Sequence, residues 1–112
     1  MKHELKKVCR IVDEMLTLLL HDTTEVDFKI INRDEKVIIH ILGYNTKFDD
    51  EYIDTLKIIL NKQRQAEVEE YYWQLAGETE SDELVLVSAM VDHATVEKQD
   101  GNLYIELIRL YT

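Results

Sequence analysis

Apolar residues recur with two different periods along the first third of the chain. Over residues 3–21 they are spaced three and four apart, which predicts a largely buried helix. Residues 26–30 alternate between apolar and charged, as in a strand with one face in water. Residues 32–35 are polar and predict a turn, and the nearly continuous apolar run 37–42 predicts a central strand covered on at least one side. The helical stripe consists of Leu5, Val8, Val12, Met15 and Leu19, widened by Cys9, Ile11 and Leu16.

Helical spacing returns in the middle of the chain. Residues 49–62 place apolar side chains on one helical face, and the three acids at 49–51 suit the start of a helix, where carboxylates cap free amides. Residues 66–76 predict another helix, which ends at Gly77, a natural helix stop. Residues 82–93 are ambiguous, because their apolar positions fit a helix while their β-branched content fits a strand.

The end of the chain predicts a β-hairpin. Asp100-Gly101 is a strong signal for a two-residue turn, because both positions must accept positive φ. Pairing outward from this turn sets residues 94–99 against residues 102–111. The pairs Val96–Ile105 and Ala94–Leu107 then form an apolar face toward the core, and the opposite face carries the pairs Glu97–Tyr104 and Thr95–Glu106.

These elements predict a single α+β domain spanning residues 1–112. We expect a two-layer sandwich of about four strands in two hairpins, with three or four helices on one face. The 112-residue length and the apolar content of 46% suit one hydrophobic core. Cys9 is the single cysteine, so it cannot form an internal disulfide, and we expect it to be a small core residue. No secretory signal and no bilayer-length apolar run are evident, which favours a cytoplasmic protein.

Negative charge is concentrated in the second half of the chain. The formal net charge is −10. Residues 65–112 contain eleven acids and two bases, a net of −9, so nearly all of the charge lies there. Such a surface repels a phosphate backbone, and we expect no nucleic-acid partner. The one basic cluster is expected to be the solvated start of the first helix and consists of Lys2, Lys6, Lys7 and Arg10.

Aromatic residues interrupt the acidic stretch 66–83. Tyr71, Tyr72 and Trp73 span most of a helical turn, so not all three can point into one core. One interpretation places Tyr72 and Leu75 in the core and leaves the other rings half exposed. The other is a docking surface, because Tyr and Trp give large contact areas with few rotatable bonds. This predicted surface, which would bind a protein partner or a second copy of the chain, comprises Glu67, Glu70, Tyr71 and Trp73.

The remaining polar residues form no complete catalytic or metal motif. The four histidines lack metal-ligand spacing, and no serine or cysteine stands in a nucleophile motif. His40 lies within the apolar run VIIHIL, where a hydrogen-bonded core or sheet-face histidine is expected rather than a catalytic base. We therefore expect neither catalytic residues nor a metal site.

Three segments together carry a family resemblance. In VDEMLTLLLHD, Asp13, Thr17 and His21 follow one another at four-residue steps. A hairpin follows directly in VDFKIINRDEKVIIHI, and the chain ends with LVLVSAMVDHATVEKQDGNLYIELIRLY. This order resembles the histidine-kinase-type ATPase superfamily in its short anti-sigma-factor kinase form, whose opening helix carries an acid, an asparagine and often a histidine at those steps. The resemblance implies a closing helix within residues 82–93.

The nucleotide-binding positions of that family are mostly lost. Its asparagine binds magnesium, for which Thr17 is a poor substitute, and Asp13 is one methylene shorter than the usual glutamate. The first hairpin should end in Asp-x-Gly-x-Gly, which reads adenine, but ILGYNTKF keeps Gly43 and has no acid before Phe48. The glycine-rich phosphate loop is replaced by GETESD, where Gly77 stands among acids. The resemblance thus implies a remnant nucleotide pocket at Asp13, Thr17, His21 and Gly43, with no bound cofactor expected; an intact site would hold ATP with magnesium.

The hypothesis that follows is a non-catalytic regulatory or protein-interaction domain with a degenerate ATPase-like fold. Two alternatives stay open. The chain could be an enzyme, an ATP-binding anti-sigma-type serine kinase, and nucleotide binding separates this alternative from the first hypothesis. A small acidic chaperone is the other alternative, and it rests on size, charge and a loosely similar order of elements.

Overall fold

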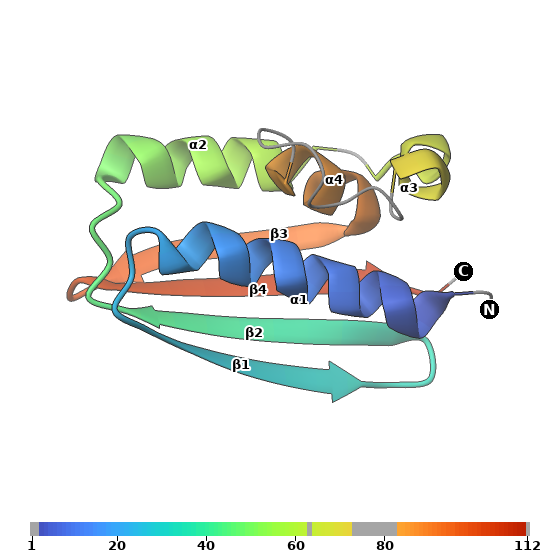
Figure 1. Ribbon diagram of the computed structural model, residues 1–112, viewed down its shortest axis with the longest axis horizontal. Coiled ribbons are helices and arrows are strands. Elements are labelled where there is room, and N and C mark those ends of the chain that lie inside the picture. The colour runs from blue at the N-terminus through green and yellow to red at the C-terminus, as the bar shows by residue number, and fades with distance from the viewer. Residues whose placement is uncertain (1–2, 63, 73–82, 112) are drawn as a thin grey trace.

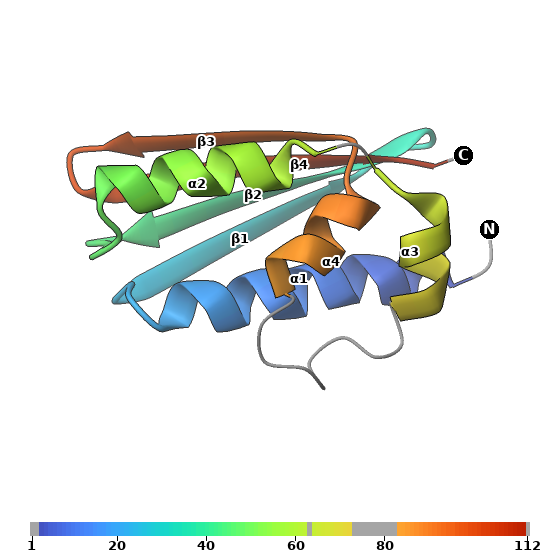
Figure 2. The ribbon, with the colours of Figure 1, turned by 90° about the horizontal axis from the view of Figure 1, so that it is seen from above.

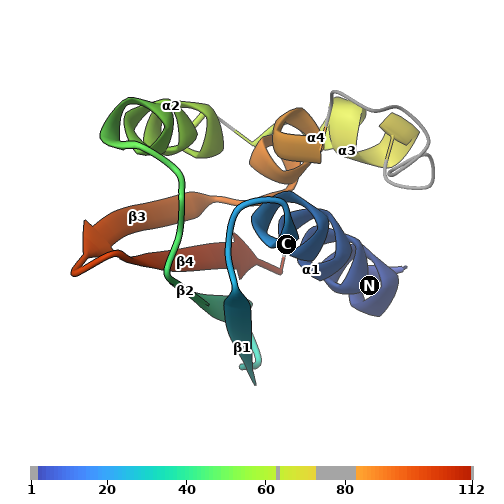
Figure 3. The same cartoon turned by 60° about the vertical axis from the view of Figure 1, so that its left-hand side comes forward.

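The computed structural model describes residues 3–62, 64–72 and 83–111. In this part of the chain, four helices lie on one face of a four-stranded antiparallel sheet (Figure 1; Figure 3). The predicted two-layer α+β sandwich is confirmed. None of the described helices is both long and apolar enough to cross a membrane. The elements are α1 (Glu4–Leu20), β1 (Glu25–Asn32), β2 (Lys36–Tyr44), α2 (Asp50–Leu60), α3 (Ala66–Tyr72), α4 (Glu83–Met90), β3 (His93–Gln99) and β4 (Asn102–Leu110).

The two most apolar strands form the centre of the sheet. The strand order is β1-β2-β4-β3, and all neighbours are antiparallel. Strands β2 and β4 bury alternate side chains beneath the helices and turn the others to the opposite face, as the two-residue period of a strand requires. The predicted central strand at 37–42 is therefore confirmed. The large apolar side chains buried there are Val37, Ile39 and Ile41 in β2 and Leu103, Ile105 and Leu107 in β4.

The closing hairpin forms in the predicted register. Asp100 and Gly101 have φ values of 53° and 81°, the left-handed conformation that a two-residue hairpin turn demands. Val96 pairs with Ile105, which directs both side chains toward the helices and leaves Tyr104 on the opposite face. A slip of one residue would exchange these two faces.

The ambiguous stretch 82–93 contains helix α4, and strand β3 begins at His93. Helix α4 lies between α1 and α2 above the sheet, as Figure 2 shows. All five residues at 86–90 are buried. A helix enclosed over most of its length lacks a continuous polar face, which explains why the period of its apolar residues could not distinguish it from a strand.

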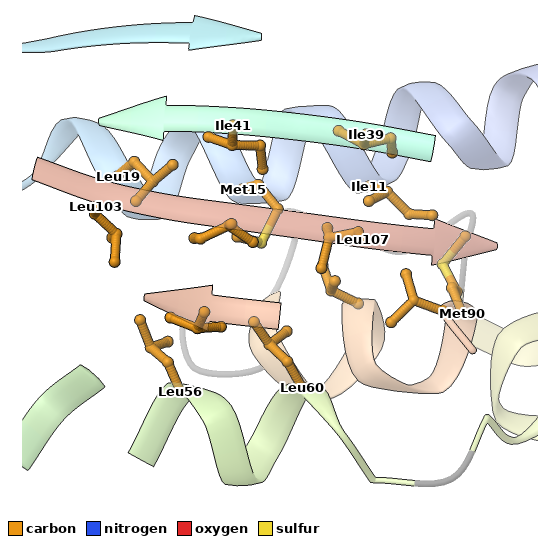
Figure 4. Packing of buried hydrophobic residues seen from close by; sticks show 14 of the residues in the cluster. Ile11, Met15, Leu19, Ile39, Ile41, Leu56, Leu60, Met90, Leu103 and Leu107 are labelled. Carbon is orange, nitrogen blue, oxygen red and sulfur yellow. The ribbon is translucent and has the colours of Figure 1, made fainter. Parts of the chain in front are cut away.

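Helix α1 buries one face rather than most of its surface. Ile11, Met15 and Leu19 point into the core beneath the helices (Figure 4). The expectation of a wide buried stripe was wrong at its margins, because Leu5 is 74% exposed. Cys9 is also exposed and is not the core residue that the sequence predicted. A single helix layer can bury only the side that faces the sheet and the neighbouring helices.

Candidate functional site

Asp13 and Thr17 lie one turn apart on the exposed side of α1. Arg10 Nη1 donates to Asp13 Oδ2 over 3.2 Å in an exposed ion pair. The Thr17 hydroxyl donates to the backbone carbonyl oxygen of Asp13 over 2.9 Å, a common arrangement for threonine within a helix. Magnesium prefers carboxylate oxygens and water, so a neutral hydroxyl held by its own helix contributes little to a metal site.

The other two residues of the predicted pocket lie at the far end of α1. His21 is the C-cap of α1 and lines a hollow of about 400 Å³. Gly43 lies in β2 beneath Thr23, where an added Cβ would come within 3.0 Å of Thr23 Cγ2, so close packing accounts for this glycine. Of the four predicted residues, His21 alone lines the hollow. Its other lining residues are Leu18, Asp22, Lys47, Phe48, Asp49 and Tyr52.

The rim of this hollow combines aromatic and charged groups. The rings of Phe48 and Tyr52 stack with their centroids 4.6 Å apart. Asp49 Oδ1 accepts a hydrogen bond from the backbone N–H of Tyr52 over 2.8 Å, which confirms the predicted capping of α2. Two acids, Asp22 and Asp49, and one base, Lys47, line the hollow. The excess of negative charge at this rim would repel a polyphosphate. The volume of the hollow lies near the lower end of the range of small-molecule sites.

The sheet face turned away from the helices is rich in apolar residues. A wet antiparallel face usually carries polar side chains. Here Ile31 in β1 lies opposite Ile38 in β2, which lies opposite Ile108 in β4. On the same face Tyr104 is 41% exposed and Leu110 is 36% exposed. We call this surface the open face. Ile31, Ile38 and Ile108 are half-buried, and a row of partly exposed apolar side chains of this kind is typical of an interaction site.

A histidine and a glutamate pair at the centre of the open face. His40 in β2 lies directly opposite Glu106 in β4, and His40 Nε2 lies 2.8 Å from Glu106 Oε2. The side chains are 43% and 42% exposed. The expectation of a hydrogen-bonded sheet-face histidine is confirmed. A cross-strand pair of this kind holds both side chains in a defined position.

A shallow hollow of about 510 Å³ crosses the open face beside this pair. It reaches from Asp27 in β1 to Glu97 in β3, with Leu42 and Tyr104 between them. Asp27 Oδ2 accepts a hydrogen bond from the Tyr44 hydroxyl over 2.8 Å, which raises the pKa of Tyr44 and orients the carboxylate. The hollow therefore has an apolar and aromatic floor with a carboxylate at each end.

A buried ion network attaches α3 to the rest of the molecule. Glu69 accepts hydrogen bonds from Arg109 Nη1 at 2.7 Å and Nη2 at 3.0 Å, and from Lys7 Nζ at 2.8 Å. The Arg109 guanidinium also donates to both carboxylate oxygens of Glu4 and to the carbonyl oxygen of Met90. All five of its N–H groups are thus used, as a buried guanidinium requires.

The network shifts the ionisation of its members. Burial by itself would raise the pKa of Glu69, but hydrogen bonds from Arg109 and Lys7 outweigh burial and lower this pKa from 4.5 to about 2. Burial would likewise lower the pKa of Arg109, but hydrogen bonds to Glu69 and Glu4 raise it. Both groups are charged at neutral pH, so the loss of either would leave a buried charge without its main partner.

Lys7 departs from the expectation that the N-terminal basic cluster is solvated. It is 3% exposed, because its ammonium group pairs with Glu69 and Glu70 of α3. These partners lie 62 and 63 positions away in the sequence. No local pattern of residues could have indicated the pairing.

The predicted docking surface lies only partly within the described residues. Glu67 and Glu70 are exposed on α3, whereas the neighbouring Glu69 is buried rather than part of an acidic surface. The side chain of Tyr71 and the whole of Trp73 lie outside the part of the chain that the structure describes. The same is true of the segment that replaces the phosphate loop.

Comparison with known proteins finds no matching family model and no matching curated protein. Within the described residues, no group of three or more His, Cys, Asp or Glu side chains is placed to hold a metal ion. Function therefore has to be inferred from geometry. Sequence reasoning singled out His40 and paired Glu97 with Tyr104, but it did not bring together the full row of residues at the open-face hollow, because the two hairpins join only once β2 is known to pair with β4. Those residues are Asp27, Leu42, Tyr104 and Glu97.

Proposed function

We propose that this chain is a non-catalytic protein-interaction domain that acts by contact through its open face. The observation that carries the proposal is the row Ile31–Ile38–Ile108, with Tyr104 and Leu110 nearby on the same face. Ile31, Ile38 and Ile108 are half-buried, and leaving the rest of their surface in water costs free energy that burial against a partner would regain. Polar residues would serve the fold equally well here, because the helices and the core lie on the other side of the sheet.

The proposal includes a degenerate relationship to the ATPase superfamily that the sequence resembles. The order of helix, hairpin, helices and hairpin is compatible with that resemblance. The Thr17 hydroxyl bonds to the backbone of Asp13 within α1, and the hollow at His21 is lined by two acids and one lysine. These features favour a domain that has kept the architecture of the superfamily but has lost its ability to bind a nucleotide.

Nucleotide addition separates this proposal from the kinase alternative. We expect millimolar ATP or ADP, with or without magnesium, to leave the melting temperature unchanged. A ligand present at about 100 times its dissociation constant stabilises a fold by about 2.7 kcal/mol, which corresponds to a rise of several degrees in a domain of this size. A clear magnesium-dependent rise would favour the serine kinase, and Asp13 and Thr17 would then be the first residues to mutate.

Site-specific photocrosslinking, carried out in the cells that naturally make this protein, tests contact through the open face. A photoreactive amino acid placed at Ile38 or Ile108 should give discrete crosslinked species with a partner. Ile58 is the matched control, because it is the same residue type and is 68% exposed on α2, on the opposite side of the molecule. Equal crosslinking from all three positions, or crosslinking from Ile58 alone, would exclude the open face as the contact surface.

A further inference from the structure

One row of residues crosses all four strands at the hollow on the open face. Asp27 pairs with Leu42, Leu42 with Tyr104, and Tyr104 with Glu97, in the strand order β1-β2-β4-β3. Residues that pair directly point to the same face of a sheet, and the hollow of about 510 Å³ lies over this row. The row therefore presents a carboxylate at each edge of the sheet, with an aliphatic and an aromatic side chain between them.

The spacing of this row matches one face of an α-helix lying across the strands. Neighbouring strands are about 4.8 Å apart, so the four residues lie at about 0, 5, 10 and 14 Å along the row. An α-helix rises about 1.5 Å per residue, and its positions i, i+4, i+7 and i+11 lie on one face at about 0, 6, 10 and 16 Å. A flexible side chain at each end of the helix accommodates the difference of about 2 Å.

We infer that the open face binds a cationic amphipathic helix of a partner protein, laid across the strands over this row. Basic residues at i and i+11 meet Asp27 and Glu97, and apolar residues at i+4 and i+7 pack on Leu42 and Tyr104. The inference rests on the proposed function, since it names the kind of partner that the open face accepts. It is the helix-in-groove mode of recognition, with a sheet as the receiving surface.

Charge complementarity selects a basic partner. Among the residues that line the hollow, Asp27, Glu97 and Glu106 carry carboxylates, whereas Lys29 carries the one ammonium group. A second copy of this chain would bring the same carboxylates and a formal charge of −10 to the interface, so repulsion opposes a dimer through this face. The Tyr44 hydroxyl already orients the Asp27 carboxylate, which reduces the entropy lost on binding a cation.

Synthetic peptides test this inference directly. The probe is an alanine- and glutamine-based helical peptide of about 18 residues, with lysines at i and i+11 and leucines at i+4 and i+7. The matched peptide has the same composition, but both lysines are moved to the opposite side of the helix. Fluorescence anisotropy should give the first peptide an affinity about three- to tenfold higher, because two exposed ion pairs are gained. Amide chemical shifts should change along β2 and β4.

Charge-neutralising variants of the protein locate the binding surface. The double variant Asp27→Asn with Glu97→Gln should lose the preference for the first peptide. The control Glu51→Gln with Asp54→Asn removes the same charge from exposed positions of α2 and should keep that preference. Tyr104→Ala should weaken both peptides about tenfold, while circular dichroism should show that the fold is retained.

The outcomes distinguish this inference from the proposed function. Equal affinity for the two peptides, or an equal loss in the open-face and α2 variants, would mean general attraction to an acidic protein and would overturn the helix inference. Preferred binding of an extended peptide, or dimerisation in sedimentation experiments, would overturn it as well. In each of these cases crosslinking from Ile38 and Ile108 would still support contact through the open face. If neither Ile38 nor Ile108 gave crosslinked species, the proposed function itself would be overturned.

Discussion

Arg109 shows how single residues fix the polar interior of this domain. It lies near the end of β4, on the strand face whose other buried side chains are apolar. Its exposed fraction is 1%. Glu69 lies 40 positions away in the sequence and Glu4 lies 105 positions away. The sequence pattern predicted the strand correctly, but it could not predict the buried pair, because the partners come together only in the folded chain.

Replacing Glu69 by Gln should be strongly destabilising. The neutral amide keeps some hydrogen-bonding capacity but leaves Arg109 as a buried charge without its main partner, so we expect a loss of about 3 kcal/mol in the free energy of unfolding. Urea denaturation measures it. Glu67→Gln is the matched control, because Glu67 is exposed on the same helix and should change stability by less than about 0.5 kcal/mol. Similar losses in both variants would argue against the buried network.

At the level of helices and strands, an element could be predicted correctly when the residues that determine it lie close together in the sequence. The turn at Asp100-Gly101 and the alternation around it fix the closing hairpin locally, and both were predicted correctly. Helix α4 could not be assigned from its period because its surroundings bury most of it. The margins of α1 were misjudged for the opposite reason: Leu5 and Cys9 continue the apolar pattern, but no neighbouring element covers them.

The register of the closing hairpin can be tested by two neighbouring substitutions. Ile105→Ala removes a core side chain that is 3% exposed and should cost about 2–4 kcal/mol. Glu106→Ala removes only the partly exposed pair with His40 and should cost less than about 1 kcal/mol. Denaturant melts that gave the reverse order would indicate a register shifted by one residue.

The whole molecule has one covered and one uncovered sheet face, and the two were predictable to different degrees. The covered face follows from the apolar positions of β2 and β4, which the sequence displays directly. The open-face row depends on Leu42 and Tyr104 becoming neighbours through the pairing of β2 with β4. That pairing joins segments about 60 residues apart and leaves no local signal. The complete row was therefore inaccessible to sequence reasoning, although all four of its strands and the pair Glu97–Tyr104 had been predicted.

Two opposing electrostatic effects act on the whole molecule as the pH falls. At pH 7 the formal net charge is −10, and its reduction toward pH 5 relieves repulsion within the folded state. Below that range Glu69 opposes this trend. Its pKa is about 2 in the folded state, against an ordinary value of 4.5, so the unfolded chain takes up this proton first. The stabilisation from Glu69 is complete above about pH 5 and is lost as the pH falls from about 4.5 to 2.

We therefore expect the free energy of unfolding to be highest near pH 5 and to fall steeply below pH 4.5. Glu69 accounts for about 3–4 kcal/mol of this fall, because its pKa differs by about 2.5 between the two states and each unit of pKa difference corresponds to about 1.4 kcal/mol. Urea denaturation at a series of pH values measures the profile. In Glu69→Gln the fall between pH 4.5 and 2 should be shallower by about that amount, whereas Glu67→Gln should follow the parent protein. A fall of the same steepness in all three proteins would assign acid unfolding to other carboxylates and leave Glu69 without its predicted role.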